Sequence, residues 1–247
     1  MKFYTGIGSR ETPEEYLNIM TELSYYLNKK GWTLRSGGSW GADEAFQKSV
    51  TDYSNIFLPT SYFRKNEGIK GVCISDKELI REAMYIVSKY DLHENWDNLL
   101  NSKGGLTSLQ MHTRNVFQVL GTDLRSPSKF VVCYTRDKAC TLDEITKDTG
   151  GTRTALRLAC HLNVNVFNIA REDHKLRILN WINEMKKEEL ELEKLQGYLS
   201  LNTNSQKNVK KFKYWFYKIV SYAIKINIIY KHAKKIINNN SNWNFII

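Results

Sequence analysis

Short apolar runs alternate along the chain with longer segments in which apolar residues recur at helical spacing. The short runs are KFYTGIGS at 2–9, WTLRSGG at 32–38, NIFLP at 55–59, KFVVCYT at 129–135 and NVNVFNIA at 163–170. Helical spacing covers 13–30, 43–50, 75–91, 107–121, 150–162 and 173–196. Strands that alternate with helices predict an α/β fold of βαβ units, with a parallel sheet flanked by helices.

The positive charge of the chain is concentrated near its C-terminus. The 247 residues carry a formal net charge of +10, and residues 202–247 contain nine Lys and no Asp or Glu. The rest of the chain, with 27 basic and 26 acidic side chains, is nearly neutral. Lysines interleaved with aromatic residues and isoleucines are typical of a basic amphipathic helix. We therefore predict an α/β domain at 1–200 and a basic helical C-terminal extension at 201–247.

The four cysteines give no sign of a metal site. No two of them form a CxxC pair, so we predict no metal and free thiols, as in a reducing cytosol. The N-terminus lacks the apolar stretch of a signal peptide, and Lys218 and Lys225 interrupt the segment nearest to a membrane span. We expect a cytoplasmic protein without a cofactor. A membrane surface is not the expected partner, although the lysine and aromatic segment would suit an anionic one.

The segment LRSGGSWGAD joins a predicted strand to a predicted helix and contains three glycines. Helix N-termini carry unpaired N–H groups and a partial positive charge, and glycine lets the backbone approach an anion closely. We therefore expect a phosphate to be held by Ser36, Gly37, Gly38, Ser39 and Gly41. Asp43 either caps the following helix or accepts a hydrogen bond from a ribose hydroxyl. A strand-to-helix turn also needs glycine for structural reasons alone.

Two further glycine turns are found near the ends of predicted strands. The first contains Gly6, Gly8, Ser9 and Arg10, and the second contains Gly150, Gly151 and Thr152. In an open parallel sheet, ligands bind beyond the carboxyl ends of the strands, where all three turns are predicted. Together they predict one polar, amide-lined cleft for an anion or a nucleotide.

The predicted helix at 107–121 carries a cluster of polar side chains. His112 and Asn115 share one face of this helix, with Arg114 beside them. A single histidine on such a helix is most often structural. Its place beside a glycine-rich cleft favours ligand contact by His112, Arg114 and Asn115.

Four motifs, in this order, resemble phage-encoded proteins of the SLOG superfamily: YTGIGSRETP, GWTLRSGGSWGADEAF, MHTRNVFQVLGTDLRSPSKFVVCYT and GGTRTALRLA…NVNVFNIA. The resemblance covers about residues 3–170. It is to relatives described as DNA recombination-mediator protein A-like (DprA-like), in a superfamily that includes the LOG phosphoribohydrolases. It implies a Rossmann-like fold with a nucleotide-type cleft, a nucleotide or single-stranded DNA as partner, and a homodimer as a common assembly. The ligand positions that it implies are Gly6, Ser9, Arg10, Ser36, Gly37, Gly38, Gly41, Asp43, His112, Arg114, Asn115, Gly150, Gly151 and Thr152.

One departure from the LOG enzymes bears on activity. Those enzymes follow their glycine turn with a glutamate in the next helix, which assists glycosidic cleavage, whereas GGTRTALRLACHL contains no carboxylate. Glycosidase chemistry needs such a group to stabilise an oxocarbenium-like centre or to activate water. Asp43 or Glu44 could substitute, but the missing glutamate favours binding over catalysis.

Three interpretations of function remain. A DprA-like protein would bind single-stranded DNA, with lysines on backbone phosphates and an aromatic ring stacked on a base. The side chains expected to do so are Lys210, Lys211, Lys213, Trp215 and Lys218. A binding module would sense or sequester a small nucleotide-derived signal, and a LOG-like enzyme would hydrolyse a nucleotide N-glycosidic bond. The family resemblance favours the first by a small margin.

Overall fold

Parallel strands form the central sheet of the computed structural model, which describes residues 1–101 and 106–202, with side chains as far as residue 194. The strands are β1 (Lys2–Gly8), β2 (Trp32–Arg35), β5 (Phe130–Tyr134) and β6 (Asn165–Asn168), in the order β2-β1-β5-β6. Thr5 of β1 lies opposite Arg35 on one side and Val131 on the other, and every pair is parallel. The prediction of an α/β fold with a parallel, Rossmann-like sheet is confirmed.

A shorter parallel pair continues the sheet beyond β2. It consists of β3 (Phe57–Leu58) and β4 (Val72–Cys73). One parallel bridge between Ser36 and Ile56 joins this pair to the chain that leaves β2, and the N–H of Phe57 donates to the carbonyl of Ser36 (2.8 Å). The hydrophobic pattern predicted β3. It predicted no strand or helix between residues 60 and 74, where β4 lies.

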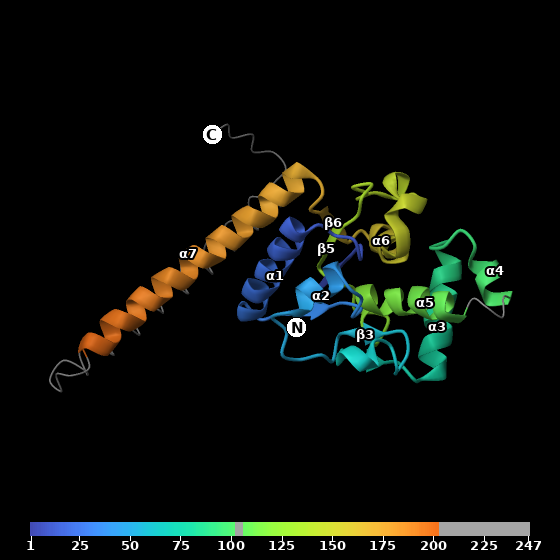
Figure 1. Ribbon diagram of the computed structural model, residues 1–247, viewed down its shortest axis with the longest axis horizontal. Coiled ribbons are helices and arrows are strands. Elements are labelled where there is room, and N and C mark those ends of the chain that lie inside the picture. The colour runs from blue at the N-terminus through green and yellow to red at the C-terminus, as the bar shows by residue number, and fades with distance from the viewer. Residues whose placement is uncertain (102–105, 203–247) are drawn as a thin grey trace, which may run out of the picture. The chain divides into compact units, whose positions relative to one another are not determined.

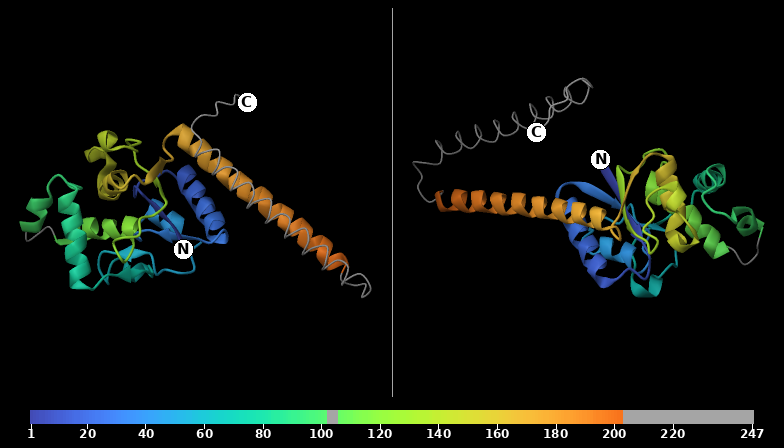
Figure 2. Two further views of the ribbon diagram at one scale, coloured as in Figure 1. Left: turned by 180° about the vertical axis from the view of Figure 1, so that it is seen from behind. Right: turned by 90° about the horizontal axis from the view of Figure 1, so that it is seen from above.

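Helices lie on both sides of the sheet (Figure 1). They are α1 (Glu14–Lys29), α2 (Ala42–Gln47), α3 (Lys77–Lys89), α4 (Trp96–Asn101), α5 (Leu106–Leu120), α6 (Arg153–His161) and α7 (Glu172–Asn202). Short 3₁₀ segments are η1 (Lys65–Glu67), η2 (Leu142–Glu144) and η3 (Lys147–Thr152). The six predicted helices are confirmed, and α4 was not predicted. Two views from other directions show α1 and α2 on one side of the sheet and α5 and α6 on the other (Figure 2).

Local sequence accounts for where these helices begin and end. Pro13 precedes α1, and Gly31, with a φ of +74°, follows its last residues in the left-handed conformation that glycine tolerates. The carboxylate of Asp76 caps α3 by accepting from the backbone N–H groups of Glu78 (2.8 Å) and Leu79 (3.2 Å).

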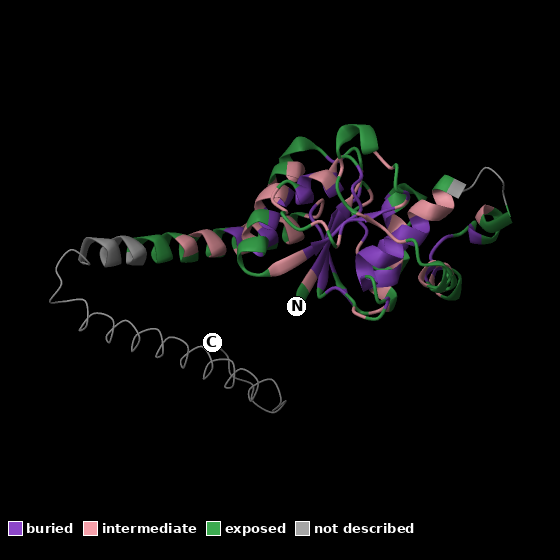
Figure 3. Cartoon of the chain, turned by 90° about the horizontal axis from the view of Figure 1, so that it is seen from below, coloured by how far each residue is buried: buried purple, intermediate pink, exposed green. Residues whose placement is uncertain are grey.

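The strands separate two hydrophobic cores. In β5, Phe130 and Val132 pack on the side of α1 and α2, whereas Val131 and Cys133 pack on the side of α5 and α6. Because successive side chains of a strand point to opposite faces, a continuous apolar run fills both cores at once. Figure 3 shows buried residues gathered in the strands and on the inner sides of the helices.

Residues Met1–Lys186 form one compact unit that contains the whole sheet. Lys187 begins a second unit, so this boundary falls within α7, whereas the sequence analysis placed it after residue 200. Of the predicted extension at 201–247, the structure describes only the last residues of α7. Among the described helices, none has the length and apolar character needed to cross a membrane.

The order of the strands creates a switch point between β1 and β5. The chain leaves β1 through α1 toward β2 and leaves β5 through α6 toward β6, on opposite sides of the sheet. The loops that follow β1 and β5 therefore diverge, and a crevice opens between their carboxyl ends.

Candidate functional site

A cavity of about 1080 Å³ opens at this switch point. Its walls come from the loop after β1, the start of α2, one side of α5, the loop after β5, and η3. Eleven of the predicted ligand residues line it: Gly8, Ser9, Arg10, Ser39, Asp43, His112, Arg114, Asn115, Gly150, Gly151 and Thr152. The tertiary structure thus brings together residues from segments that are more than one hundred positions apart in the chain.

A buried ion pair between Arg114 of α5 and Asp43 of α2 forms part of the cavity wall. Each side chain is 5% exposed, and 3.6 Å separates Nη1 of Arg114 from Oδ2 of Asp43. Burial raises the pKa of the Asp43 carboxyl and lowers that of the Arg114 guanidinium, and the attraction between them opposes both shifts. Asp43 also accepts from the backbone N–H of Ser39 (3.3 Å), while Gly41 occupies the N-cap of α2. Asp43 therefore ties the loop to α5 and does not cap its own helix.

Gly37 and Gly38 have a packing role, which corrects the expectation that their backbone faces a phosphate. Both are buried, and neither lines the cavity. A Cβ on Gly37 would overlap the guanidinium of Arg114 and the amide of Gln118. Gly38 has a φ of +71°, and a Cβ there would lie 2.7 Å from the side chain of Leu58. The turn therefore makes room for the buried arginine, and it is Arg114 that reaches the cavity.

Gly6, Ser36 and Gly41 also lie outside the cavity lining, where the sequence analysis had expected them to contact a ligand. Ser36 Oγ donates to the carbonyl of Gly6 (2.7 Å) and so joins β2 to β1. Gly41 has a φ of +74°, and a Cβ there would lie 2.6 Å from the carbonyl of Ser9. These residues position the loops that carry the lining residues.

The turn before α6 exposes its backbone to open space. Gly150 has a φ of +66° and a ψ of −147°, which interrupts the helical run inside η3, shortly before α6 begins. A Cβ added at Gly150 or at Gly151 would meet no atom within 4 Å. Asn115 Nδ2 donates to the carbonyl of Gly151 (2.9 Å), so α5 holds the turn in place. The N-terminal end of α6, with Thr152 as its N-cap, thus borders the cavity in the orientation that favours an anion.

His112 lines the cavity as a neutral imidazole. Burial lowers its pKa to about 3, and the neighbouring groups His93, Arg153 and Arg114 add to this shift. Its Nδ1 lies 2.7 Å from Thr154 Oγ1, and its ring centroid is 4.1 Å from that of His93. At neutral pH His112 can donate a hydrogen bond to a ligand or accept one from it, but it adds no positive charge to the cavity.

Asp137, just after β5, lines the cavity although the sequence analysis did not select it. Its Oδ2 accepts from Thr146 Oγ1 (3.3 Å) and from Thr149 Oγ1. Burial by itself raises the pKa of this carboxyl, but hydrogen bonds from Thr149, Thr135, the N–H of Ala139 and Thr146 together lower it. The sequence contained a signal that could have selected Asp137, because this residue follows the predicted strand KFVVCYT at the edge of the sheet where the other candidate residues lie.

Comparisons with protein-family models, curated proteins and solved structures find no match to this chain. The resemblance to the SLOG superfamily therefore stays a prediction. The site is interpreted from its own geometry.

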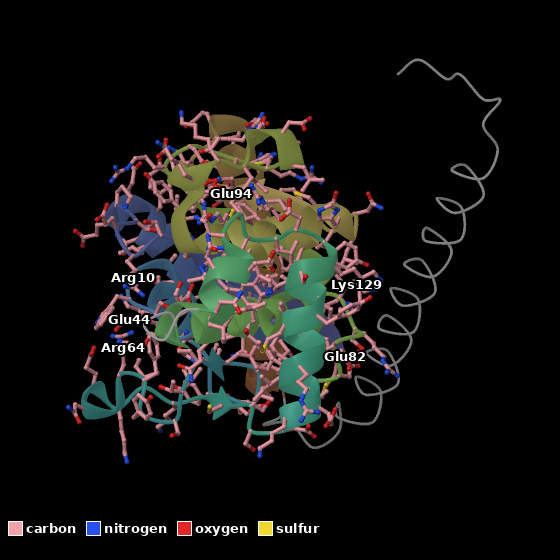
Figure 4. The ribbon with its side chains drawn as sticks, turned by 90° about the vertical axis from the view of Figure 1, so that its right-hand side faces the viewer. Arg10, Glu44, Arg64, Glu82, Glu94 and Lys129 are labelled. Atoms are coloured by element: carbon pink, nitrogen blue, oxygen red, sulfur yellow. The ribbon has the colours of Figure 1, made fainter. Side chains whose placement is uncertain are left out.

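Glu44, predicted as a candidate catalytic carboxylate, does not line the cavity. Its side chain is 46% exposed and pairs with Arg64 at 3.3 Å. Arg64 also donates to the carbonyl of Gly38 (2.9 Å) and lies 4.5 Å from the ring centroid of Trp40, which Arg10 approaches at 5.7 Å. Arg10, Glu44 and Arg64 are labelled in Figure 4. The geometry gives Glu44 a part in this surface cluster and none in chemistry within the cavity.

Two other predictions concern metals and the C-terminal segment. Within residues 1–101 and 106–202, no group of three or more His, Cys, Asp or Glu could hold a metal ion. The candidate nucleic-acid contacts lie outside the described residues: Lys210, Lys211, Lys213, Trp215 and Lys218.

Proposed function

We propose that this protein binds a small nucleotide-type ligand in the cavity between the ends of β1 and β5, with the phosphate of the ligand held inside the cavity. The proposal is carried by one observation: a loop that bears Arg10 and the open turn before α6 border the same cavity of about 1080 Å³. That volume lies just above the usual range for small-molecule sites, about 300–1,000 Å³.

The expected position of the phosphate is beside Gly151 and Thr152. The backbone there is accessible, since a Cβ on Gly151 would meet nothing within 4 Å, and the start of a helix favours negative charge. Arg10 is an exposed cation on the opposite loop, and a guanidinium can bind two phosphate oxygens at once.

Acidic side chains in the cavity wall favour a small ligand over a strand of nucleic acid. Asp137 and Asp148 line the cavity, together with Glu11, which pairs with Arg136 at 2.7 Å, and the buried Asp43, which pairs with Arg114. A strand places a negative charge on every nucleotide and would meet these carboxylates, whereas a mononucleotide can keep its single phosphate beside the cations.

Calorimetric titration with the four ribonucleoside 5′-monophosphates tests the proposal. We expect one or more to bind, Gly151→Val to abolish binding by filling the open space, and Arg10→Gln to weaken it about tenfold or more. Arg125→Gln removes an exposed arginine that does not line the cavity and should change nothing. Failure of all four nucleotides to bind, or binding unaffected by Gly151→Val, would contradict the proposal. Chromatography of the same mixtures reports any free base and hence hydrolysis.

Single-stranded DNA is a second candidate ligand, favoured by the nine Lys and the absence of acidic residues in 202–247. Such a segment would bind phosphates with an affinity that falls steeply with salt. We expect truncation after residue 201 to remove DNA binding measured at low salt while leaving mononucleotide binding intact. Equal DNA binding by the truncated chain would contradict this role.

A further inference from the structure

Asp137 is a charged acceptor in the wall of a cavity whose proposed ligand is itself an anion. We infer that Asp137 accepts a hydrogen bond from a ribose hydroxyl and makes the cavity selective for nucleotides that carry their sugar hydroxyls over the 2′,3′-dideoxy counterparts. The inference rests on the nucleotide function proposed above.

Three threonines keep Asp137 as an acceptor. Thr149 Oγ1 accepts from the backbone N–H of Thr146 (3.1 Å), and Thr146 Oγ1 accepts from that of Asp148 (3.1 Å). Thr135 Oγ1 accepts from Asn168 Nδ2 (2.6 Å). A hydroxyl that already accepts still has its one proton to donate, and all three hydroxyls are hydrogen-bonded to Asp137.

The same contacts hold the carboxylate in one position, and one of them is weak. Oδ2 receives the hydroxyls of Thr146 and Thr149, whereas Oδ1 receives the backbone N–H of Ala139 at 3.4 Å, a long hydrogen bond. With Thr135, four donors meet the roughly four lone-pair directions of the ionised carboxylate, so a donor from the cavity side would take the place of the long contact from Ala139. An acceptor-only group in a partly buried wall is complemented by a ligand group that donates.

The position of Asp137 indicates which part of a nucleotide would supply that donor. Asp137 is hydrogen-bonded to Thr149, the residue directly before the Gly150–Gly151 turn where the phosphate is expected. The phosphate carries like charge and no proton to spare. The sugar is joined directly to the phosphate, whereas the hydrogen-bonding edge of the base lies on the far side of the sugar. A ribose hydroxyl is therefore the nearest neutral donor.

Matched ligands test the inference on the unaltered protein. The probes are each ribonucleoside 5′-monophosphate that binds and its 2′,3′-dideoxy counterpart, compared by calorimetry. We expect the dideoxy nucleotide to bind about tenfold or more weakly, the loss of a hydrogen bond to a charged acceptor. Equal affinities would overturn the inference and leave the proposed function standing. If no nucleotide of either series bound, both would fail together.

Variants at Asp137 supply the second half of the test. Asp137→Asn should weaken binding of the ribonucleotide about tenfold or more and leave the affinity of the dideoxy nucleotide unchanged. Asp143→Asn, on η2 and away from the cavity lining, is the matched control. Equal losses for both ligands would show a general effect on the site and overturn the inference. If Asp137→Asn does not fold, the ligand comparison on the unaltered protein decides alone.

Discussion

Replacing Gly37 with Ala tests whether the glycine after β2 serves the fold or a ligand. A phosphate site would lose affinity on this change and keep its stability. In the structure, the added methyl group would overlap the guanidinium of Arg114 and the amide of Gln118. We therefore expect a loss of folding stability that is independent of any ligand.

The magnitude follows from the burial of the ion pair. Arg114 and Asp43 are each 5% exposed, so the guanidinium cannot move aside without leaving a buried carboxylate uncompensated. Breaking a buried pair in this way costs about 3–5 kcal/mol. An alanine in a compatible backbone conformation regains about 0.4–1 kcal/mol by restricting the unfolded chain. The net loss expected for Gly37→Ala is about 2–5 kcal/mol.

Urea unfolding of the ligand-free protein measures this loss, with Gly151→Ala as the matched control. The methyl group added at Gly151 meets no atom within 4 Å, so that variant should stay within about 1 kcal/mol of the unaltered protein. In an Arg114→Met background, the additional cost of Gly37→Ala should be smaller, because the clashing guanidinium is gone and only the amide of Gln118 still has to move. If Gly37→Ala were as stable as the unaltered chain, the packing role assigned to this glycine would be refuted.

Three further predictions concern single residues. Gly150→Ala should cost about 1–2 kcal/mol in urea unfolding although the space around it is open, because its φ of +66° suits glycine; no loss would contradict this. Glu44→Gln should change the free energy of unfolding by less than about 1 kcal/mol, since its partly exposed pair with Arg64 is weak, and should leave nucleotide affinity unchanged. The free energy of unfolding should fall by up to about 1.4 kcal/mol per pH unit as the pH drops from 6.5 toward about 3. The reason is that His112 binds a proton in the unfolded chain, whereas the folded protein excludes it. His93, whose pKa burial also lowers, adds to this slope; His112→Gln should flatten it and the exposed His161→Gln should not.

The hydrophobic pattern was sufficient to predict most of the fold. Period and length distinguish KFVVCYT as a buried strand from TSLQMHTRNVFQVLG as a helix, and the structure has β5 and α5 at these positions. The pattern failed at β4 and α4, which are short and depend on contacts with distant residues. Two residues of strand carry almost no periodic signal.

The candidate site was predictable only in part. Gly150 and Gly151 were selected as glycines of an anion-binding turn, and the structure has them bordering open space. Gly37 and Gly38 were selected by the same rule, yet they pack around Arg114 and Leu58. The local sequence signal is identical in the two turns, because a glycine is required both where backbone meets a ligand and where it meets a buried side chain.

The sequence by itself determined the succession of strands and helices and the edge of the sheet at which polar residues collect, because hydrophobic periodicity and chain order are local properties. Only the tertiary structure decided which of those residues share a cavity. It directed Arg114 toward Asp43, moved Glu44 into a surface pair with Arg64, and brought Asp137 to the cavity wall. The direction of a side chain depends on the neighbours that fill the space around it, and those neighbours come from distant parts of the chain.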